Sequence, residues 1–415
     1  METRNLVAFA LAIFCVAIVL RIAVIVIGET YSSPRFFELE KIAISLIDTG
    51  QYGNAIGPSS GPTAYFTPIY PIILSGVYKI FGSDSAGEFV RQSLNSTFMS
   101  LQYALLPFIA RAVGISACFG LFAGLLGAIV PFHFWTELRG QESPLAAVSL
   151  VCLSLLFLNF NNQSTHTTRS VSILGFSWGL GVLVAPSLLP VLCGFFVLRF
   201  LKNRKQGLHC FFREVAITGL VMVLVIFPWG FRNYLQLGEF IATRSSLGIV
   251  LNLSNNDSAA AAWFENTAGR TEGGDPWHSP SERKKYIHMG EVAYTQEKME
   301  SAIKWIRSNP RRFLALTAER SLYFWFPKME RPGHSEVLWL ISTLSIVGLI
   351  RLIIIRHPSA YFFLAIWVTF PAVYYFTQFV GRYRIIILWT FLITAVVAIQ
   401  WLLKFIEDVY RRRAT

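Results

Sequence analysis

Residues 6–27, LVAFALAIFCVAIVLRIAVIVI, decide the fold class, because these 22 residues contain a single charged side chain, Arg21. An apolar helix of about 20 residues is long enough to cross the hydrocarbon core of a bilayer. Nine further apolar stretches follow, near residues 90–110, 114–135, 144–160, 171–185, 187–201, 215–231, 336–355, 359–376 and 385–403. Together they predict an all-α polytopic membrane protein with about ten transmembrane helices.

The composition excludes an ordinary soluble protein. Of the 415 residues, 54% are hydrophobic and only 14% are charged, and the mean hydropathy is +0.50. A soluble protein of this length needs a larger polar surface. The net charge of +12 could attract nucleic acid, but the basic residues gather in alternate short loops, as the positive-inside rule requires. We therefore expect membrane lipid as a partner, no nucleic acid, and both termini in the cytoplasm.

This topology places two long segments outside the cytoplasm, residues 28–89 and 232–335. We expect residues 1–231 to form a transmembrane catalytic module that includes the first outer loop. The second segment then forms an extracytoplasmic loop region, and residues 336–415 supply the C-terminal transmembrane helices. Both outer segments are expected to carry short amphipathic helices, one of them near residues 281–307. Two such long outer loops suggest a chemical site at the outer surface.

Residues 36–48, FFELEKIAISLID, predict an amphipathic helix that carries two candidate acids. A projection at 100° per residue places Glu38 on a polar stripe with Lys41, and Glu40 on the apolar side. A carboxylate held at such a helix can accept a proton from a hydroxyl group, and partial burial raises its pKa toward the useful range. The alternative is a surface helix whose acids are solvated or pair with Lys41.

Other charged residues fall at the outer ends of the predicted spans. Glu142 precedes the fourth span, where it either belongs to a site or caps the helix. Arg232, Arg244, Arg382 and Arg384 are basic on the side where the positive-inside rule disfavours basic residues. The guanidinium group is well shaped to bind phosphate, so these arginines are candidate ligands. Contact with lipid headgroups is the alternative.

No motif indicates a cofactor. The chain has no HExxH sequence, no Walker A loop and no GxGxxG sequence, which are the usual marks of zinc and nucleotide sites. Its five cysteines have no CxxC spacing, so neither a zinc site nor a disulfide framework is indicated. We expect no cofactor; a divalent metal is compatible with the chemistry, but no ligand cluster is visible.

A series of motifs in a fixed order gives the chain a family resemblance. These are GPTAYFTPIYP at 61–71, Phe81-Gly82, PWGFRNY at 228–234, RSSLG at 244–248, Asn255-Asn256, GEVAY at 290–294, NPRRF at 309–313 and RYR at 382–384. In this order, over nearly the whole chain, they resemble the bacterial GT-C membrane glycosyltransferases. The protein O-mannosyltransferases and aminoarabinose transferases of family 39 are the relatives that the chain resembles.

The resemblance implies a hexosyl- or pentosyltransferase that uses a polyprenyl-phosphate-linked sugar as its donor. The site would face the periplasm from the inner membrane, and the acceptor would be a glycan, a lipid or a protein. Attack by the acceptor hydroxyl in line with the departing phosphate implies inversion at the anomeric carbon, with one carboxylate as the base.

Family members place the presumed base in the first outer loop. Glu38 matches the position of close bacterial relatives, whereas more distant members have the acid about a turn earlier, where this chain has Pro34-Arg35. Glu38 and Glu40 therefore both stay open as the base, with Glu29 a distant third, and Glu142 matches the family's second acid. The phosphate ligands match Arg232, Arg244 and Arg382. The remaining candidate substrate-binding residues, taken from the same motifs, are Tyr65, Tyr70, Asn255 and Arg384.

Two other functions compete with this interpretation. A transporter or flippase for a lipid-linked substrate would predict Gly or Pro breaks at matched positions of two repeated halves, and the sequence has no such repeat. A non-catalytic assembly protein with the GT-C fold would keep the helices but would not need the acids.

Overall fold

The computed structural model describes residues 3–130, 132–139, 141–163, 166–202, 208–266, 274–329 and 334–414. Within these ranges the regular structure is helical, apart from two isolated β-bridges, which join Gly53 to Pro62 and Ala262 to Phe379. The predicted all-α fold class is confirmed.

Helices lie at all ten predicted stretches. They are α1 (Thr3–Ile27), α4 (Ser85–Ala104) with α5 (Leu106–Ala112), α6 (Ala117–Ile129), α8 (Ser143–Asn161), α9 (Thr168–Val184), α10 (Leu189–Lys202), α11 (Leu208–Leu237), α16 (His334–Ile354), α17 (Ser359–Ala372) and α19 (Leu388–Ala414). Five of them, α1, α8, α11, α16 and α19, are each long and apolar enough to cross a membrane. Helix α4 is less apolar because it carries buried charges, including Glu88 and Arg91.

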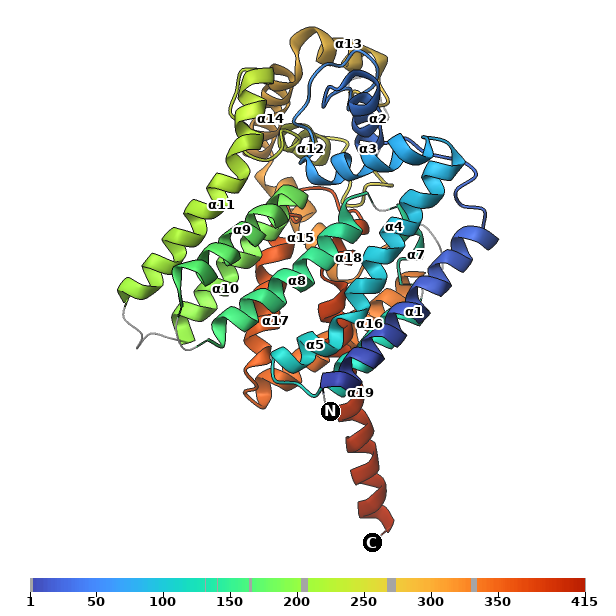
Figure 1. Cartoon of the computed structure of the whole chain (residues 1–415), viewed down its shortest axis with the longest axis vertical. Coiled ribbons are helices and arrows are strands. Elements are labelled where there is room, and N and C mark those ends of the chain that lie inside the picture. Colours follow the sequence, from blue (N-terminus) through green and yellow to red (C-terminus); the bar gives the residue numbers. More distant parts are fainter. Residues whose placement is uncertain are drawn as a thin grey trace.

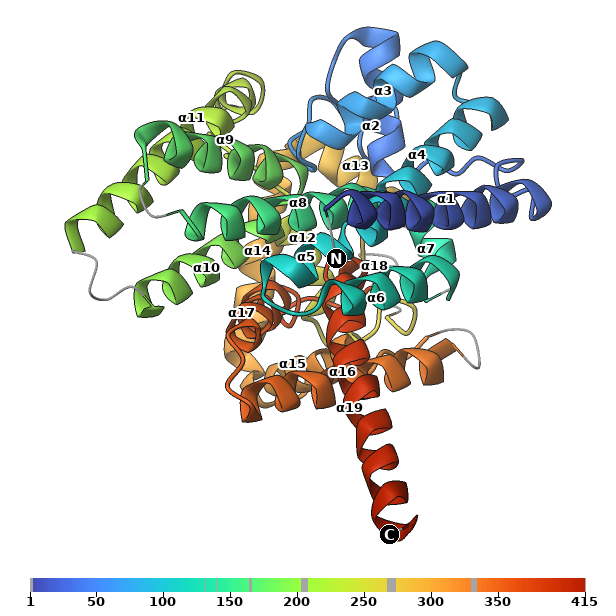
Figure 2. The same cartoon turned by 60° about the horizontal axis from the view of Figure 1, so that its bottom comes forward.

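The helices pack into one bundle through small residues. Helices α16 and α19 approach so closely that a Cβ atom at Gly348 would lie 1.8 Å from the carbonyl oxygen of Thr394. Small residues allow this close approach between helices in lipid, where association depends on van der Waals contact. Between α9 and α10 the chain reverses through a short 3-10 turn, Pro186–Leu188, as expected for two spans that meet at a tight turn. Helices α1 and α11 lie on opposite sides of the bundle (Figures 1 and 2).

Short helices occupy the segments between the spans. They are α2 (Glu38–Thr49), α3 (Ile69–Phe81), α7 (Phe134–Arg139), α12 (Leu247–Ser254), α13 (Pro280–Met289), α14 (Glu291–Ser308), α15 (Pro310–Trp325) and α18 (Arg382–Ile385). Helices α2, α3, α12, α13 and α14 gather at one end of the bundle, which we call the outer end (Figure 1). The start of α1 and the end of α19 lie toward the opposite end.

The amphipathic stretch near residues 281–307 differs from its prediction as a single helix. It forms two helices, α13 and α14, which are separated at Gly290. Gly290 has a φ angle of +78°, a left-handed conformation that glycine adopts at little cost and that ends a helix. The break lets α13 and α14 lie against each other and brings Glu291, the first residue of α14, into the interior.

The two outer loops share one hydrophobic core. Tyr52 and Tyr65 from the first loop pack in the same buried cluster as Tyr286 and Tyr294 from the second loop. Trp229 near the end of α11 joins this cluster and meets the Tyr52 ring edge-on at 4.8 Å. The loops therefore form one folded unit on top of the bundle.

Candidate active site

Charged side chains from four distant segments meet between this outer unit and the bundle. Glu38 is the first residue of α2, and Glu142 lies directly before α8. Arg244 lies between α11 and α12, and Arg382 begins α18. These four residues, all candidates from the sequence, lie near one another, and Gln141 joins them.

Gln141 connects one of the acids to one of the arginines. Its side-chain amide donates a hydrogen bond to Glu38 Oε2 at 3.3 Å, and its Oε1 accepts a hydrogen bond from Arg382 Nη1. The backbone of Gln141 has a φ angle of +53°, which is uncommon for a residue other than glycine. Such costly conformations are concentrated at functional sites. The Glu38 carboxylate and the Arg382 guanidinium are thus held on the two ends of one amide.

Glu142 faces the other arginine. Its Oε1 lies 3.8 Å from Arg244 Nη1, and both side chains are mostly covered. The second oxygen, Oε2, is buried and has no hydrogen-bond partner among the described residues, and the same holds for Arg382 Nε. Buried polar atoms are rarely left unpaired, so both atoms are available to a ligand. Glu142 occupies the N-cap position of α8, but its side chain makes no capping hydrogen bond.

The surroundings of Arg382 favour its charged form on balance. Burial opposes that charge, but the Tyr383 phenol and the carboxylates of Glu142 and Glu38 raise the pKa of Arg382 overall. Two acids and two guanidinium groups in one place can hold an anion and accept a proton side by side.

Tyr65 also lies within reach of these charges. Burial raises the pKa of Tyr65 well above its usual value; Glu38 raises it further, and Arg244 opposes the shift. The phenol therefore keeps its proton and can donate a hydrogen bond. Its ring meets Trp277 edge-on, with centroids 5.4 Å apart, so an aromatic surface adjoins the charged groups.

Arg232, a candidate phosphate ligand, has backbone partners instead. Its guanidinium donates to the carbonyl oxygens of Thr63 at 2.7 Å and Tyr52 at 2.6 Å. It also lies 5.3 Å from the centroid of the Tyr52 ring and 5.2 Å from that of Trp229. The structure thus uses Arg232 to hold the first outer loop on α11, and does not join it to the group around Glu38.

Three other candidates are fully buried and are bonded within the fold. Arg384 donates to Ser342 Oγ at 2.5 Å, and Tyr70 donates to Asn95 Oδ1 at 3.0 Å. The Asn255 amide donates to two backbone carbonyls at 2.9 and 3.1 Å. The structure places these three side chains in packing positions, at a distance from the group formed by Glu38 and Arg382.

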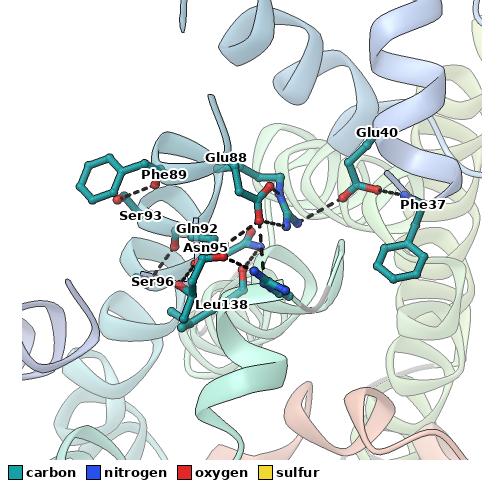
Figure 3. A network of polar contacts seen from close by, with 12 residues as sticks. Phe37, Glu40, Glu88, Phe89, Gln92, Ser93, Asn95, Ser96 and Leu138 are labelled. Carbon is teal, nitrogen blue, oxygen red and sulfur yellow. Dashed lines mark hydrogen bonds and ion pairs between the residues drawn. The ribbon is translucent and has the colours of Figure 1, made fainter. Parts of the chain in front are cut away.

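Glu40 belongs to a separate buried network (Figure 3). Its side chain is 0% exposed; Oε1 lies 3.1 Å from Arg91 Nη1, and Oε2 accepts the backbone N–H of Phe37 at 3.1 Å. Arg91 is also bonded to both oxygens of Glu88, at 2.8 and 2.7 Å. Glu40 and Glu88 thus flank one guanidinium, and the network fastens α2 to α4.

Two residues of this region are not among the candidates from the sequence. Gln141 is a neutral amide, and no pattern in the sequence marks it. Glu291 lies in the GEVAY motif, but three of its four partners, Thr63, Ala64 and Ser245, are far away in the chain. Within the described ranges, no group of three or more His, Cys, Asp or Glu side chains could hold a metal ion.

Comparisons with known proteins bear on the fold. No family model matches the chain, and no curated protein matches its sequence. Among solved structures, the apo oligosaccharyltransferase of Archaeoglobus fulgidus is similar, with a TM-score of 0.50 and 14% identity over 98% of this chain and 52% of that one. The oligosaccharyltransferase AglB of the same organism, in complex with an inhibitory peptide and a dolichol-phosphate, gives a TM-score of 0.51 and 13% identity over 97% and 51%.

A bacterial structure is also similar, at a lower score. ArnT from Cupriavidus metallidurans, bound to undecaprenyl phosphate, gives a TM-score of 0.43 and 12% identity over 96% of this chain and 78% of that one. The chain spans about half the length of the archaeal oligosaccharyltransferases. The chain shares its fold with the archaeal oligosaccharyltransferases, which agrees with the GT-C fold that the motif order implies.

Proposed function

We propose that this chain is a membrane glycosyltransferase that transfers a sugar from a polyprenyl-phosphate-linked donor to an acceptor hydroxyl. The observation that carries the proposal is the bridge through Gln141, which holds the Glu38 carboxylate beside the Arg382 guanidinium. A proton acceptor next to a phosphate-binding cation is what this transfer needs. The archaeal AglB structure, which shares the fold, holds a dolichol-phosphate.

In the proposed reaction Glu38 is the general base. The acceptor oxygen attacks the anomeric carbon and its proton passes to the Glu38 carboxylate, while the bond between that carbon and the phosphate oxygen breaks. The polyprenyl phosphate leaves with an added negative charge, which Arg382 and Arg244 stabilise. The attacking and leaving oxygens lie on opposite faces of the sugar, so the configuration inverts.

The surroundings of the two acids favour Glu38 over Glu142 as the base. Glu38 is partly exposed and accepts one weak hydrogen bond, from Gln141 at 3.3 Å. Glu142 directs one oxygen at Arg244 and the other into the interior. We therefore assign Glu142 to the orientation of Arg244, and its unpartnered oxygen to contact with a substrate hydroxyl.

The proposed reaction takes place at the outer end of the bundle, on the periplasmic face of the inner membrane. The spans of residues 1–231 and 336–415 provide an apolar surface for the polyprenyl tail, while residues 28–89 and 232–335 enclose the sugar. The sugar is a hexose or a pentose, and the acceptor is a glycan, a lipid or a protein. These assignments rest on the family resemblance together with the position of the charged group.

A transfer assay with a matched pair of variants tests the proposal. The purified protein is supplied with a panel of polyprenyl-phosphate sugars and with envelope lipids, glycans and proteins as acceptors. Glu38→Gln should lower the rate about 10²–10⁴-fold, as expected for the loss of a general base. Asp48→Asn, an exposed change on the same helix, should leave the rate unchanged.

Three outcomes would count against parts of the proposal. Full activity of Glu38→Gln would refute Glu38 as the base and leave Glu142 as the candidate. Movement of the donor across liposomes without any transfer would identify a flippase. If neither transfer nor movement occurs with any donor, the proposal of a donor-dependent enzyme fails.

A further inference from the structure

Glu291 is a buried carboxylate that four donors surround. Its side chain lies at the start of α14, and the residue is 3% exposed. Oε1 accepts hydrogen bonds from the Ala64 backbone N–H and from Ser245 Oγ, both at 2.7 Å. Oε2 accepts from Tyr286 OH at 2.7 Å and from Thr63 Oγ1. The donors come from the first outer loop, from the segment after α11 and from α13.

This arrangement fixes the carboxylate without a direct ion pair. Among the described residues no cationic group is paired with Glu291, although Arg232 interacts with it electrostatically over a longer distance, so the four hydrogen bonds are its direct compensation for burial. Hydrogen bonds to an ionised carboxylate are among the stronger ones in proteins. Both oxygens already accept two donors each, so the carboxylate has little capacity left for a substrate. Glu291 therefore acts by holding its neighbours in place.

Two of these neighbours lead directly to the charged group. Ser245 follows Arg244, whose guanidinium faces Glu142, and Ala64 precedes Tyr65. The two segments are also joined to each other, because the Ser245 backbone N–H donates to the Ala64 carbonyl at 2.9 Å. The Oε1 atom of Glu291 thus holds Ser245 and Ala64, the chain neighbours of Arg244 and Tyr65.

We propose that Glu291 is a positioning residue that sets the orientation of Arg244 through Ser245, and so the affinity for the donor's phosphate. The inference rests on the proposed function and deepens it. On the opposite side of the same loop, Arg232 donates to the carbonyl oxygen of Thr63, whose hydroxyl is bonded to Glu291. One loop is thereby held from two directions, by Glu291 and by Arg232.

The test removes one of the four hydrogen bonds to Glu291 and leaves the other three intact. Ser245→Ala deletes the hydroxyl next to Arg244, and the Kd for polyprenyl phosphate is measured by titration of the purified full-length chain. We expect the Kd to rise about fivefold, as for the loss of one hydrogen bond. The kcat/KM for the donor should fall by at least the same factor, because Arg244 also stabilises the departing phosphate. Ser245→Thr keeps the hydroxyl and should restore most of the affinity. Glu300→Gln is the matched control, because Glu300 is exposed and lies on α14, the helix that begins at Glu291.

A double-mutant cycle separates positioning from a general loss of structure. In an Arg244→Ala background, Ser245→Ala should change the Kd less than twofold, because the arginine through which it acts is gone. An equal rise in both backgrounds, or no rise in either, would overturn the inference. Glu291→Gln provides a second variant for the same cycle and should behave in the same way. If the unaltered chain binds no polyprenyl phosphate, the proposed function fails. If it binds, but with a Kd that Ser245→Ala does not change, only the inference about Glu291 fails.

Discussion

Replacing Glu40 by glutamine should weaken the fold and spare the chemistry. The substitution removes the ion pair with Arg91 at 3.1 Å, while a glutamine oxygen can still accept the N–H of Phe37. Arg91 keeps its two bonds to Glu88, so no charge is left stranded and the cost stays below the 3–5 kcal/mol of a broken buried pair. Burial raises the pKa of Glu40, although Arg91 opposes the shift, so desolvation already offsets part of the pairing. We expect a loss of about 2 kcal/mol in the free energy of unfolding.

The assay compares denaturant unfolding in detergent with the rate of sugar transfer for the same preparations. Glu40→Gln should lower stability and keep the rate within about twofold of the unaltered chain, whereas Glu38→Gln should do the reverse. Asp48→Asn, on the exposed side of α2, should change neither quantity. A Glu40→Gln protein of full stability that transfers no sugar would refute this reasoning and make Glu40 the base.

Three further predictions concern the arginines and the bundle. Arg382→Lys keeps the charge but loses the planar fork, so the KM for the donor should rise about tenfold at unchanged stability, as transfer kinetics and thermal unfolding would establish. Arg232→Ala should lower the free energy of unfolding by about 2 kcal/mol, because two bonds to backbone carbonyls are lost; a stable variant with weakened donor binding would instead favour a phosphate ligand. Gly348→Ala should destabilise the bundle strongly in a detergent melt, because its Cβ would meet the Thr394 carbonyl. Gly219→Ala, where nothing lies within 4 Å, should be tolerated, and equal melting of the two variants would contradict the close packing.

The fold could be predicted from local composition, because a helix that crosses a bilayer needs about 20 predominantly apolar residues in succession. Residues 6–27 and 336–355 therefore identify α1 and α16 without reference to the rest of the chain. The break at Gly290 could not be predicted as readily, because both sides of it are amphipathic and helical. Only the packing of α13 against α14 requires the turn there.

The site was less accessible to prediction, because residue type does not reveal which partner a side chain takes. Arg232 and Arg382 carry the same charge near the same end of the bundle, yet one is bonded to backbone carbonyls and the other to Gln141. Glu38 and Glu40 are two positions apart on one helix, so they point to different sides of it. Glu38 is bonded to Gln141 and Glu40 to Arg91. The roles of these residues in catalysis stay predictions until the variants are measured.

The shared core of the two outer loops has a consequence for biosynthesis. Thr63 and Glu291 are 228 positions apart, and ribosomes add about 5–20 residues per second. The first loop is therefore synthesised roughly 10–50 s before α13 and α14, which complete its core. During that interval Tyr52 and Tyr65 lack the tyrosines of α13 and α14 against which they pack. The outer unit is assembled late, after most of the spans have been inserted. A chain truncated before α13 would keep the spans from α1 to α11, lose α16, α17 and α19, and leave this aromatic surface uncovered.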